Sequence, residues 1–129
     1  VAVGGVDDAD IVNMSGGWRV TFVLAQAQAV RVSFAYKLTQ SANYESDERS
    51  EMLAALDGTL LGPGGVIAQL VGDGNGGAAR TTGFQAFQAD LGTLAAGPHT
   101  LAIGAYNTQK TLADESTEAL VDDVLVFRP

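Results

Sequence analysis

Residues 30–38, Val30-Arg31-Val32-Ser33-Phe34-Ala35-Tyr36-Lys37-Leu38, decide the fold class. Large apolar side chains stand at every second position, and small or charged side chains stand between them. This alternation is typical of a β-strand that buries one face and presents the other to solvent. The stretch therefore predicts a strand with one face on a hydrophobic core.

Similar runs occur on both sides of this strand. In residues 18–24 the apolar side chains of Trp18, Val20, Phe22 and Leu24 alternate in the same way, which predicts a strand with Trp18 in the core. Five further short apolar runs are bounded by Gly, Pro, Asn or Asp: Met52–Leu56, Val66–Val71, Phe84–Leu91, Thr100–Tyr106 and Leu120–Phe127. Seven or eight strands with this punctuation predict an all-β fold, a jelly-roll β-sandwich of two antiparallel sheets. A helical alternative stays open for Ser50–Leu56 and Asp114–Val121, because Glu, Met, Leu and Ala favour helices.

The length of 129 residues predicts one domain spanning residues 1–129. The chain has no cysteine and no apolar run of the roughly 18–20 residues that cross a bilayer, so neither disulfides nor membrane insertion is expected. It begins at Val1 without a recognisable export signal, which suggests either a module of a larger multidomain protein or a processed product. Low lysine with high alanine and glycine is typical of secreted or cell-surface bacterial domains.

Charge limits the partners. Seven basic and fifteen acidic residues give a formal net charge of −8, and the basic residues are scattered. Nucleic acids and anionic membranes are bound through clustered Lys and Arg, so neither partner is expected.

Ten of the fifteen carboxylates lie in two short segments, residues 45–57 and 114–123. A displacement of 67 residues superimposes Asp47-Glu48-Arg49-Ser50-Glu51-Met52-Leu53 on Asp114-Glu115-Ser116-Thr117-Glu118-Ala119-Leu120. The shared pattern is Asp-Glu-x-Ser/Thr-Glu-x-Leu. Glu51 and Glu118 occupy matching places, which predicts that they act as a pair.

Carboxylates crowded beside hydrophobic strands repel one another unless a cation compensates them. Calcium takes six to eight oxygen ligands in irregular geometry, which suits carboxylates from two segments better than magnesium does. The predicted metal ligands are Asp47, Glu48, Glu51, Asp114, Glu115, Glu118, Asp122 and Asp123. The alternative is that these charges are a solvated surface that keeps an acidic protein soluble.

Two other motifs are assigned to local structure. Gly72-Asp73-Gly74-Asn75-Gly76-Gly77 is expected to be a turn, because no helical pattern follows it and it departs from the EF-hand template. Asp7-Asp8-x-Asp10 is expected to be an irregular terminal stretch. The single histidine, His99, is expected to be structural, and no serine hydrolase or zinc peptidase motif occurs. A catalytic role is therefore not expected, although two opposed carboxylates would suffice for a glycosidase.

Three stretches carry a resemblance to a known class of domain. Val121-Asp122-Asp123-Val124-Leu125-Val126 resembles the closing strand of jelly-roll carbohydrate-binding modules and MAM-like sandwiches. Leu94-Ala95-Ala96-Gly97-Pro98-His99-Thr100-Leu101 is similar to a late turn of the same domains, and Gly17-Trp18 opens the first clear strand. The resemblance implies an appendage of a secreted bacterial enzyme or surface protein, with a structural calcium ion bound by Asp122 or Asp123. The N-terminal Glu-x-Glu of such calcium-binding modules is absent, which implies a different site.

These observations favour a non-catalytic, calcium-binding module for a polysaccharide or cell-surface glycan. Sugar rings stack on exposed aromatic side chains, so Tyr44 beside the acidic loop, its neighbour Asn43, and Tyr106 at the end of a strand are the predicted ligand-binding residues. The alternative is a structural or adhesive domain that calcium rigidifies.

Overall fold

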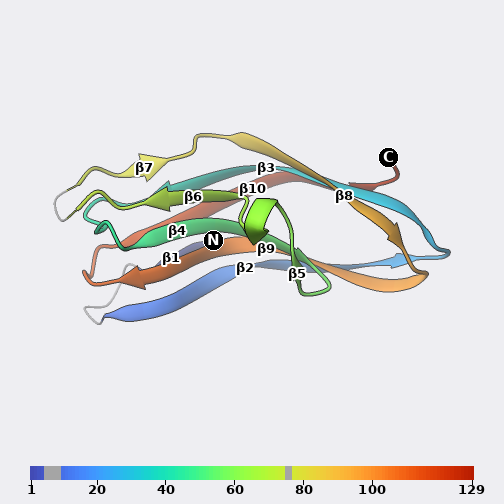
Figure 1. Cartoon of the computed structure of the whole chain (residues 1–129), viewed down its shortest axis with the longest axis horizontal. Helices are drawn as coiled ribbons and strands as arrows, with labels where there is room; N and C mark the ends of the chain where they lie inside the picture. Colours follow the sequence, from blue (N-terminus) through green and yellow to red (C-terminus); the bar gives the residue numbers. More distant parts are fainter. Residues whose placement is uncertain (5–9, 75–76) are drawn as a thin grey trace.

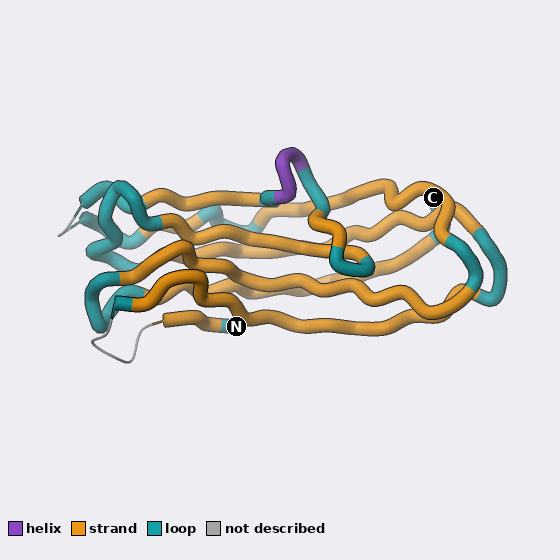
Figure 2. Tube along the Cα trace, turned by 60° about the horizontal axis from the view of Figure 1, so that its bottom comes forward, coloured by secondary structure: helices purple, strands orange, loops and turns teal. Residues whose placement is uncertain are grey.

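The computed structural model describes residues 1–4, 10–74 and 77–129, which form an elongated β-sandwich (Figures 1 and 2). The elements in chain order are β1 (Ala2–Gly4), β2 (Ile11–Leu24), β3 (Gln28–Gln40), β4 (Arg49–Leu56), β5 (Thr59–Leu60), the 3₁₀ turn η1 (Pro63–Gly65), β6 (Ala68–Val71), β7 (Arg80–Thr81), β8 (Gln85–Leu94), β9 (Gly97–Lys110) and β10 (Ser116–Phe127). Asp7, Asp8, Asn75 and Gly76 of the two motifs assigned to local structure lie outside the described residues.

The strands form two antiparallel sheets, which confirms the predicted all-β sandwich. Sheet A has the order β1-β10-β3, with β7 and β8 both paired to β3. Sheet B has the order β2-β9-β4, with β5 and β6 both paired to β4. The helical alternatives are wrong, because residues 50–56 lie in β4 and residues 116–121 lie in β10. Among the described residues, no helix is long and apolar enough to cross a membrane.

The core lies between the two sheets and is built by the alternation that opens the sequence. Val32, Phe34, Tyr36 and Leu38 of β3 are all buried, as predicted, and they pack with residues of β4, β9 and β10. Burying such side chains contributes about 1.5–3 kcal/mol each to folding. The predicted position of Trp18 is wrong, because 48% of this side chain is exposed although it lies on the inward face of β2. The alternation correctly predicted that Trp18 lies on the inward face of β2, but it does not indicate whether a strand of the other sheet covers that face.

The 67-residue displacement of the acidic motif extends to the strand pairing of both sheets. Three residue pairs between strands of sheet A have equivalents in sheet B, which are found by adding 67 to the number of the first-half residue and subtracting 67 from that of the second-half residue. The pair Gln40↔Thr117 corresponds to Asn107↔Ser50, Tyr36↔Gln85 corresponds to Ile103↔Trp18, and Gly4↔Ser116 corresponds to Val71↔Arg49. The fold is therefore an internal duplication in which β1–β4 correspond to β6 and β8–β10. Each of these ladders joins a strand of one half to a strand of the other.

Candidate acidic site

The two acidic motifs lie in equivalent loops at the same end of the sandwich. The first loop, residues 41–48, leads from β3 in sheet A to β4 in sheet B, and the second, residues 111–115, leads from β9 in sheet B to β10 in sheet A. Both loops lie at the left end of the molecule in Figure 1. Each of these two crossings between the sheets carries carboxylates.

Glu48 and Glu115 fix the two loops in the same way. The Oε2 atom of Glu48 accepts a hydrogen bond from the backbone N–H of Glu45 at 2.9 Å, and Oε2 of Glu115 accepts one from Leu112 at 2.8 Å. In return, the N–H of each glutamate donates to the carbonyl of the residue three positions earlier, at 3.0 and 3.3 Å. Thr111 N–H adds a bond to Glu115 at 2.6 Å. Each glutamate thus closes a tight turn through one oxygen.

In the part of the chain that the structure describes, the other oxygen of each glutamate has no hydrogen-bond partner. Glu48 and Glu115 are both 0% exposed, and the Oε1 atom of each is buried without a hydrogen-bond partner. One carboxylate oxygen of Glu45 joins them, so that oxygens of all three residues lie within 4.8 Å of one another. A buried acceptor without a partner costs about 1–3 kcal/mol, and more when it is charged. Among residues 1–4, 10–74 and 77–129, these two Oε1 atoms therefore meet no hydrogen-bond donor within the cluster.

Burial and mutual repulsion change the protonation of the cluster. The pKa of Glu48 is raised to about 7, chiefly by loss of water and also by the nearby Glu45 and Glu115, while the hydrogen bond from the Glu45 N–H opposes the rise. The pKa of Glu45 is lowered, chiefly because the Glu48 carboxyl donates a hydrogen bond to it when Glu48 is protonated. The two side chains therefore share a proton around neutral pH. A divalent cation that replaced this proton would compensate the carboxylates more fully.

A buried polar layer lies beneath the cluster and follows the same duplication. Gln40 donates to Ser50 at 3.1 Å, and at the equivalent positions Asn107 donates to Thr117, also at 3.1 Å. The hydroxyl groups of Ser50 and Thr117 lie 2.5 Å apart and link the two sheets. The Tyr44 hydroxyl completes the layer by hydrogen bonding to Asn107 and Thr117. The end of the core is thus held by polar side chains that satisfy one another.

The predicted exposure of Tyr44 is wrong, because the side chain is only 2% exposed and its hydroxyl is in the buried layer. A ring in this position cannot act as an open stacking platform for a sugar. Asn43 is half-buried, and its amide donates to Asp114 at 2.9 Å. Tyr106 is half-buried on the other face of β9, with its hydroxyl hydrogen-bonded to Asn13. The three predicted ligand-binding residues therefore do not form one surface.

Of the eight predicted metal ligands, only Glu48 and Glu115 meet in the cluster. Ser50 and Thr117 point into the sandwich, so Glu51 and Glu118 point outward from opposite sheets because neighbouring strand residues face opposite ways. Glu51 and Glu118 occupy equivalent places in the two halves, but the structure does not bring them together at one ion.

The remaining predicted ligands lie outside the cluster. Asp47 and Asp114 are exposed on the loops, and Asp122 and Asp123 are exposed further along β10. At about 3.4 Å per residue, Asp122 lies roughly 20 Å from Ser116, where β10 begins. It cannot reach the cluster.

Sequence reasoning missed Glu45 as a member of the site. The residue lies outside the seven-residue motif, and position 112, its equivalent in the second loop, is a leucine. Its carboxylate reaches the cluster by accepting a hydrogen bond from the Thr111 hydroxyl at 3.1 Å, across the two loops. The spacing placed Glu45 in the turn that the Glu48 carboxylate closes, but Leu112 has the same spacing from Glu115, so only the acidic character of Glu45 could have indicated its role.

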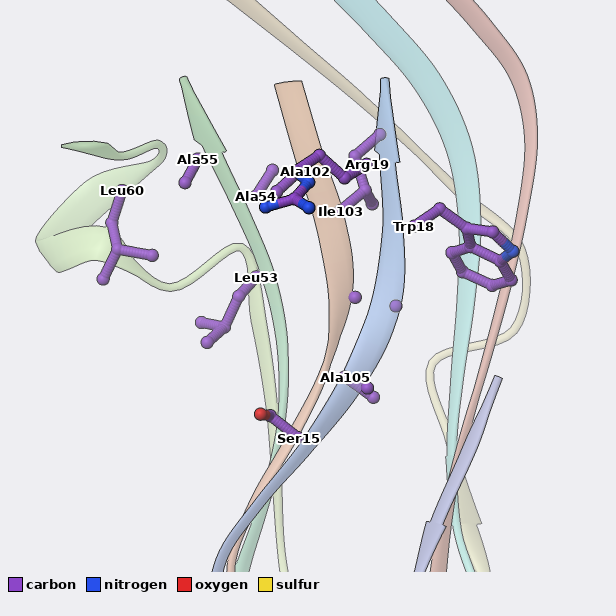
Figure 3. A pocket seen from close by; sticks show the side chains of 13 residues that line it. Ser15, Trp18, Arg19, Leu53, Ala54, Ala55, Leu60, Ala102, Ile103 and Ala105 are labelled. Atoms are coloured by element: carbon purple, nitrogen blue, oxygen red, sulfur yellow. The ribbon is translucent and has the colours of Figure 1, made fainter. Parts of the chain in front are cut away.

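A second concave feature lies on the outer face of sheet B. This groove has a volume of about 490 Å³, and its floor includes the neighbouring glycines Gly17 and Gly104. A Cβ atom at either glycine would lie 2.3–2.4 Å from a carbonyl oxygen of the facing strand, so no side chain fits there. Figure 3 shows Leu53 and Leu60 on one side of the sheet and Trp18 on the other. The groove is apolar apart from Ser15 and Arg19.

In the comparison with known proteins, no protein-family model and no curated protein matches this chain. The acidic cluster and the grooves are therefore interpreted from their own chemistry.

Proposed function

We propose that this chain is a non-catalytic module that binds a calcium ion through Glu45, Glu48 and Glu115. One observation carries the proposal: two fully buried carboxylates, brought together from two loops, each direct an unpartnered oxygen into a cluster with a third carboxylate. Such an arrangement is costly without a cation and favourable with one. The repeated use of the same glutamate position in both loops adds support.

Calcium suits this donor set better than other common cations. Three carboxylates offer up to six oxygens, and calcium accepts irregular combinations of carboxylate, carbonyl and water oxygens. Magnesium demands a nearly octahedral shell and keeps much of its water, and zinc prefers histidine or cysteine, neither of which is in the cluster. A bound ion would tie together the two loops that cross between the sheets. Its role would then be to rigidify this end of the sandwich.

Two biological settings follow from this role. With Tyr44 buried, the better supported one is a calcium-rigidified structural or adhesive domain of a secreted or cell-surface multidomain protein. The second is a polysaccharide-binding appendage of a secreted bacterial enzyme. It is favoured by the groove on sheet B, where Arg19 and Ser15 offer hydrogen bonds beside an apolar floor. The resemblance to jelly-roll carbohydrate-binding modules and MAM-like sandwiches supports both settings, as does the interleaving of the two halves in the sheets.

Isothermal titration of calcium into chelator-treated protein tests the proposed site. We expect saturable binding of one ion, weakened at least about tenfold by Glu48→Gln or Glu115→Gln, because each replacement removes a charged ligand. Glu118→Gln is the matched control, since it removes a nearby charge that points away from the cluster. Magnesium is expected to bind much more weakly. Absence of calcium binding, or equal affinities in all three variants, would contradict the site.

A further inference from the structure

Besides the replacement of Glu45 by Leu112, the two halves differ in how the outer edges of the equivalent strands β4 and β10 are paired. In the first half, the corresponding edge of β4 is paired along its length. It pairs with β6 over residues 49–52 and with β5 over residues 55–56, and the backbone N–H groups of Leu61 and Ile67 donate to it at 2.8 and 2.9 Å. Leu61 and Ile67 also pack against the core. The chain thus covers the whole of β4.

The equivalent edge of β10 is paired only at its beginning. β1 pairs with residues 116–118, and Val1 exchanges hydrogen bonds with Ala119. Beyond Ala119, the structure gives this edge no strand partner among residues 1–4, 10–74 and 77–129. Because N–H and C=O groups alternate in direction along a strand, those of Val121 point to the same edge as those of Ala119. The ladder that β1 begins can therefore be continued.

An apolar groove lies beside this edge, between the two sheets. It has a volume of about 400 Å³ and is lined mainly by Trp18 and Val20 of β2 and by Val121 and Val124 of β10. Val20 is 51% exposed and Trp18 nearly as much, although both lie on the inward face of β2. The equivalent of Val20 in the second half is Phe87 of β8, which packs against the core. The groove is continuous with the β1–β10 ladder.

We propose that this groove accepts an extended strand of another polypeptide, in which apolar side chains alternate with basic ones. The strand would pair with β10 beyond Ala119, and its apolar side chains would cover Trp18 and Val20. Its other side chains would lie on the outer face of sheet A, beside the exposed carboxylates Glu118 and Asp122. Opposite charges on neighbouring strands are favourable, and the domain as a whole carries a net charge of −8. This mode of recognition combines main-chain hydrogen bonds with side-chain pockets.

Trp18 is the only tryptophan in the chain, so its emission reports directly on this groove. The probe is a short peptide in which valine and lysine alternate, compared with one in which glutamate replaces lysine. We expect the lysine peptide to shift the Trp18 emission to shorter wavelength in a saturable way, and the glutamate peptide to bind at least about tenfold more weakly. The lysine peptide with N-methylated valines keeps charge and apolarity but loses backbone donors, and it should not bind.

Variants locate the binding. Val20→Arg should weaken the lysine peptide about tenfold or more, because burial of this side chain is lost. Val23→Arg is the matched control, since Val23 lies on the same strand, is 72% exposed and does not line the groove. Equal binding by the N-methylated peptide, or equal loss in both variants, would overturn the proposal. A Trp18 shift that depends on protein concentration without peptide would also overturn it, because a second copy would then be the occupant.

Discussion

The two acidic loops share one construction and differ in one residue that changes their chemistry. Glu48 and Glu115 close the same turn and are equally buried, yet position 45 is a glutamate in the first loop and its equivalent, position 112, is a leucine. The duplication alone would bring two carboxylates together. The third carboxylate makes the cluster able to share a proton or hold a cation. The glutamate-closed turn is thus common to both halves, whereas the third carboxylate of the cluster comes from one residue of the first half.

The largest loss of stability is expected when the buried polar layer that supports both loops is disrupted. Asn107 bonds to Tyr44, Thr117 and the backbone N–H of Gln109, whereas its equivalent Gln40 bonds to Ser50 and a carbonyl. Asn107→Ala should lower the free energy of unfolding by about 3 kcal/mol, because it leaves several buried groups unpaired. Gln40→Ala should cost less, about 2 kcal/mol. Urea denaturation of both variants measures the difference, and equal losses would contradict the asymmetry.

The next effect concerns pH in the absence of metal. The folded state raises the pKa of Glu48 to about 7 from 4.5, so the native state holds a proton that the unfolded chain releases. The free energy of unfolding of chelator-treated protein should therefore fall as the pH rises from about 4.5 to 7, by about 3 kcal/mol in total. Glu45→Leu copies the second loop and should reduce this fall. Denaturation curves across this pH range test both statements. If the free energy of unfolding of Glu45→Leu fell with pH as steeply as that of the natural chain, the coupling of Glu45 to Glu48 would be excluded.

A smaller pH effect arises at the opposite end of the sandwich. His99 Nδ1 lies 2.7 Å from Asp57 and Nε2 lies 3.0 Å from the Ala95 carbonyl, so both ring nitrogens donate when the ring is charged. The Asp57 hydrogen bond is the main cause of the raised pKa of His99. This contribution to stability is fully present below about pH 6.5 and is lost as the pH rises through the folded pKa. The equivalent of His99 in the first half is the buried Val32, which has no such dependence. Asp57→Asn should remove the effect in melting curves recorded at several pH values.

The smallest effect is expected at the outward glutamates. Glu51→Gln and Glu118→Gln remove charges on opposite outer faces, where Gln69 contacts Glu51 at 2.8 Å. Each change should alter the free energy of unfolding by less than about 0.5 kcal/mol and leave calcium affinity unchanged. Thermal melts with and without calcium check this. A loss of calcium stabilisation in either variant would show that the ion lies outside the proposed cluster.

Much of the fold followed from periodicity. Alternation over residues 30–38 and the turn residues between apolar runs predicted the principal strands, because burial of one face dictates a period of two. Position within the sheet was not predictable for Trp18, since alternation does not say whether an opposing strand covers the face. β1 and the first half of β2 were also missed, because β1 is only three residues long and Ser15-Gly16-Gly17 separate Ile11, Val12 and Met14 from the alternating run that follows.

The site was predictable only in part, for a related reason. The repeated motif identified Glu48 and Glu115, but a motif does not specify which of its side chains point inward. The direction is set by Ser50 and Thr117, which meet between the sheets and turn the next residues, Glu51 and Glu118, outward. Tyr44 was expected to be exposed because acidic residues surround it, yet its hydroxyl finds buried partners that only the paired loops provide.

The central claim is that a cation completes the Glu45, Glu48 and Glu115 cluster, and the free energy of unfolding of chelator-treated protein tests it most directly. At about a hundredfold excess of calcium over its dissociation constant, binding to the native state alone adds about 2.7 kcal/mol. We predict a gain of this size near neutral pH for the natural chain and for Glu118→Gln, and a gain of at most about 1.4 kcal/mol for Glu48→Gln, whose affinity for calcium is at least about tenfold weaker. An unfolding free energy that is the same with millimolar calcium and with chelator would contradict the account.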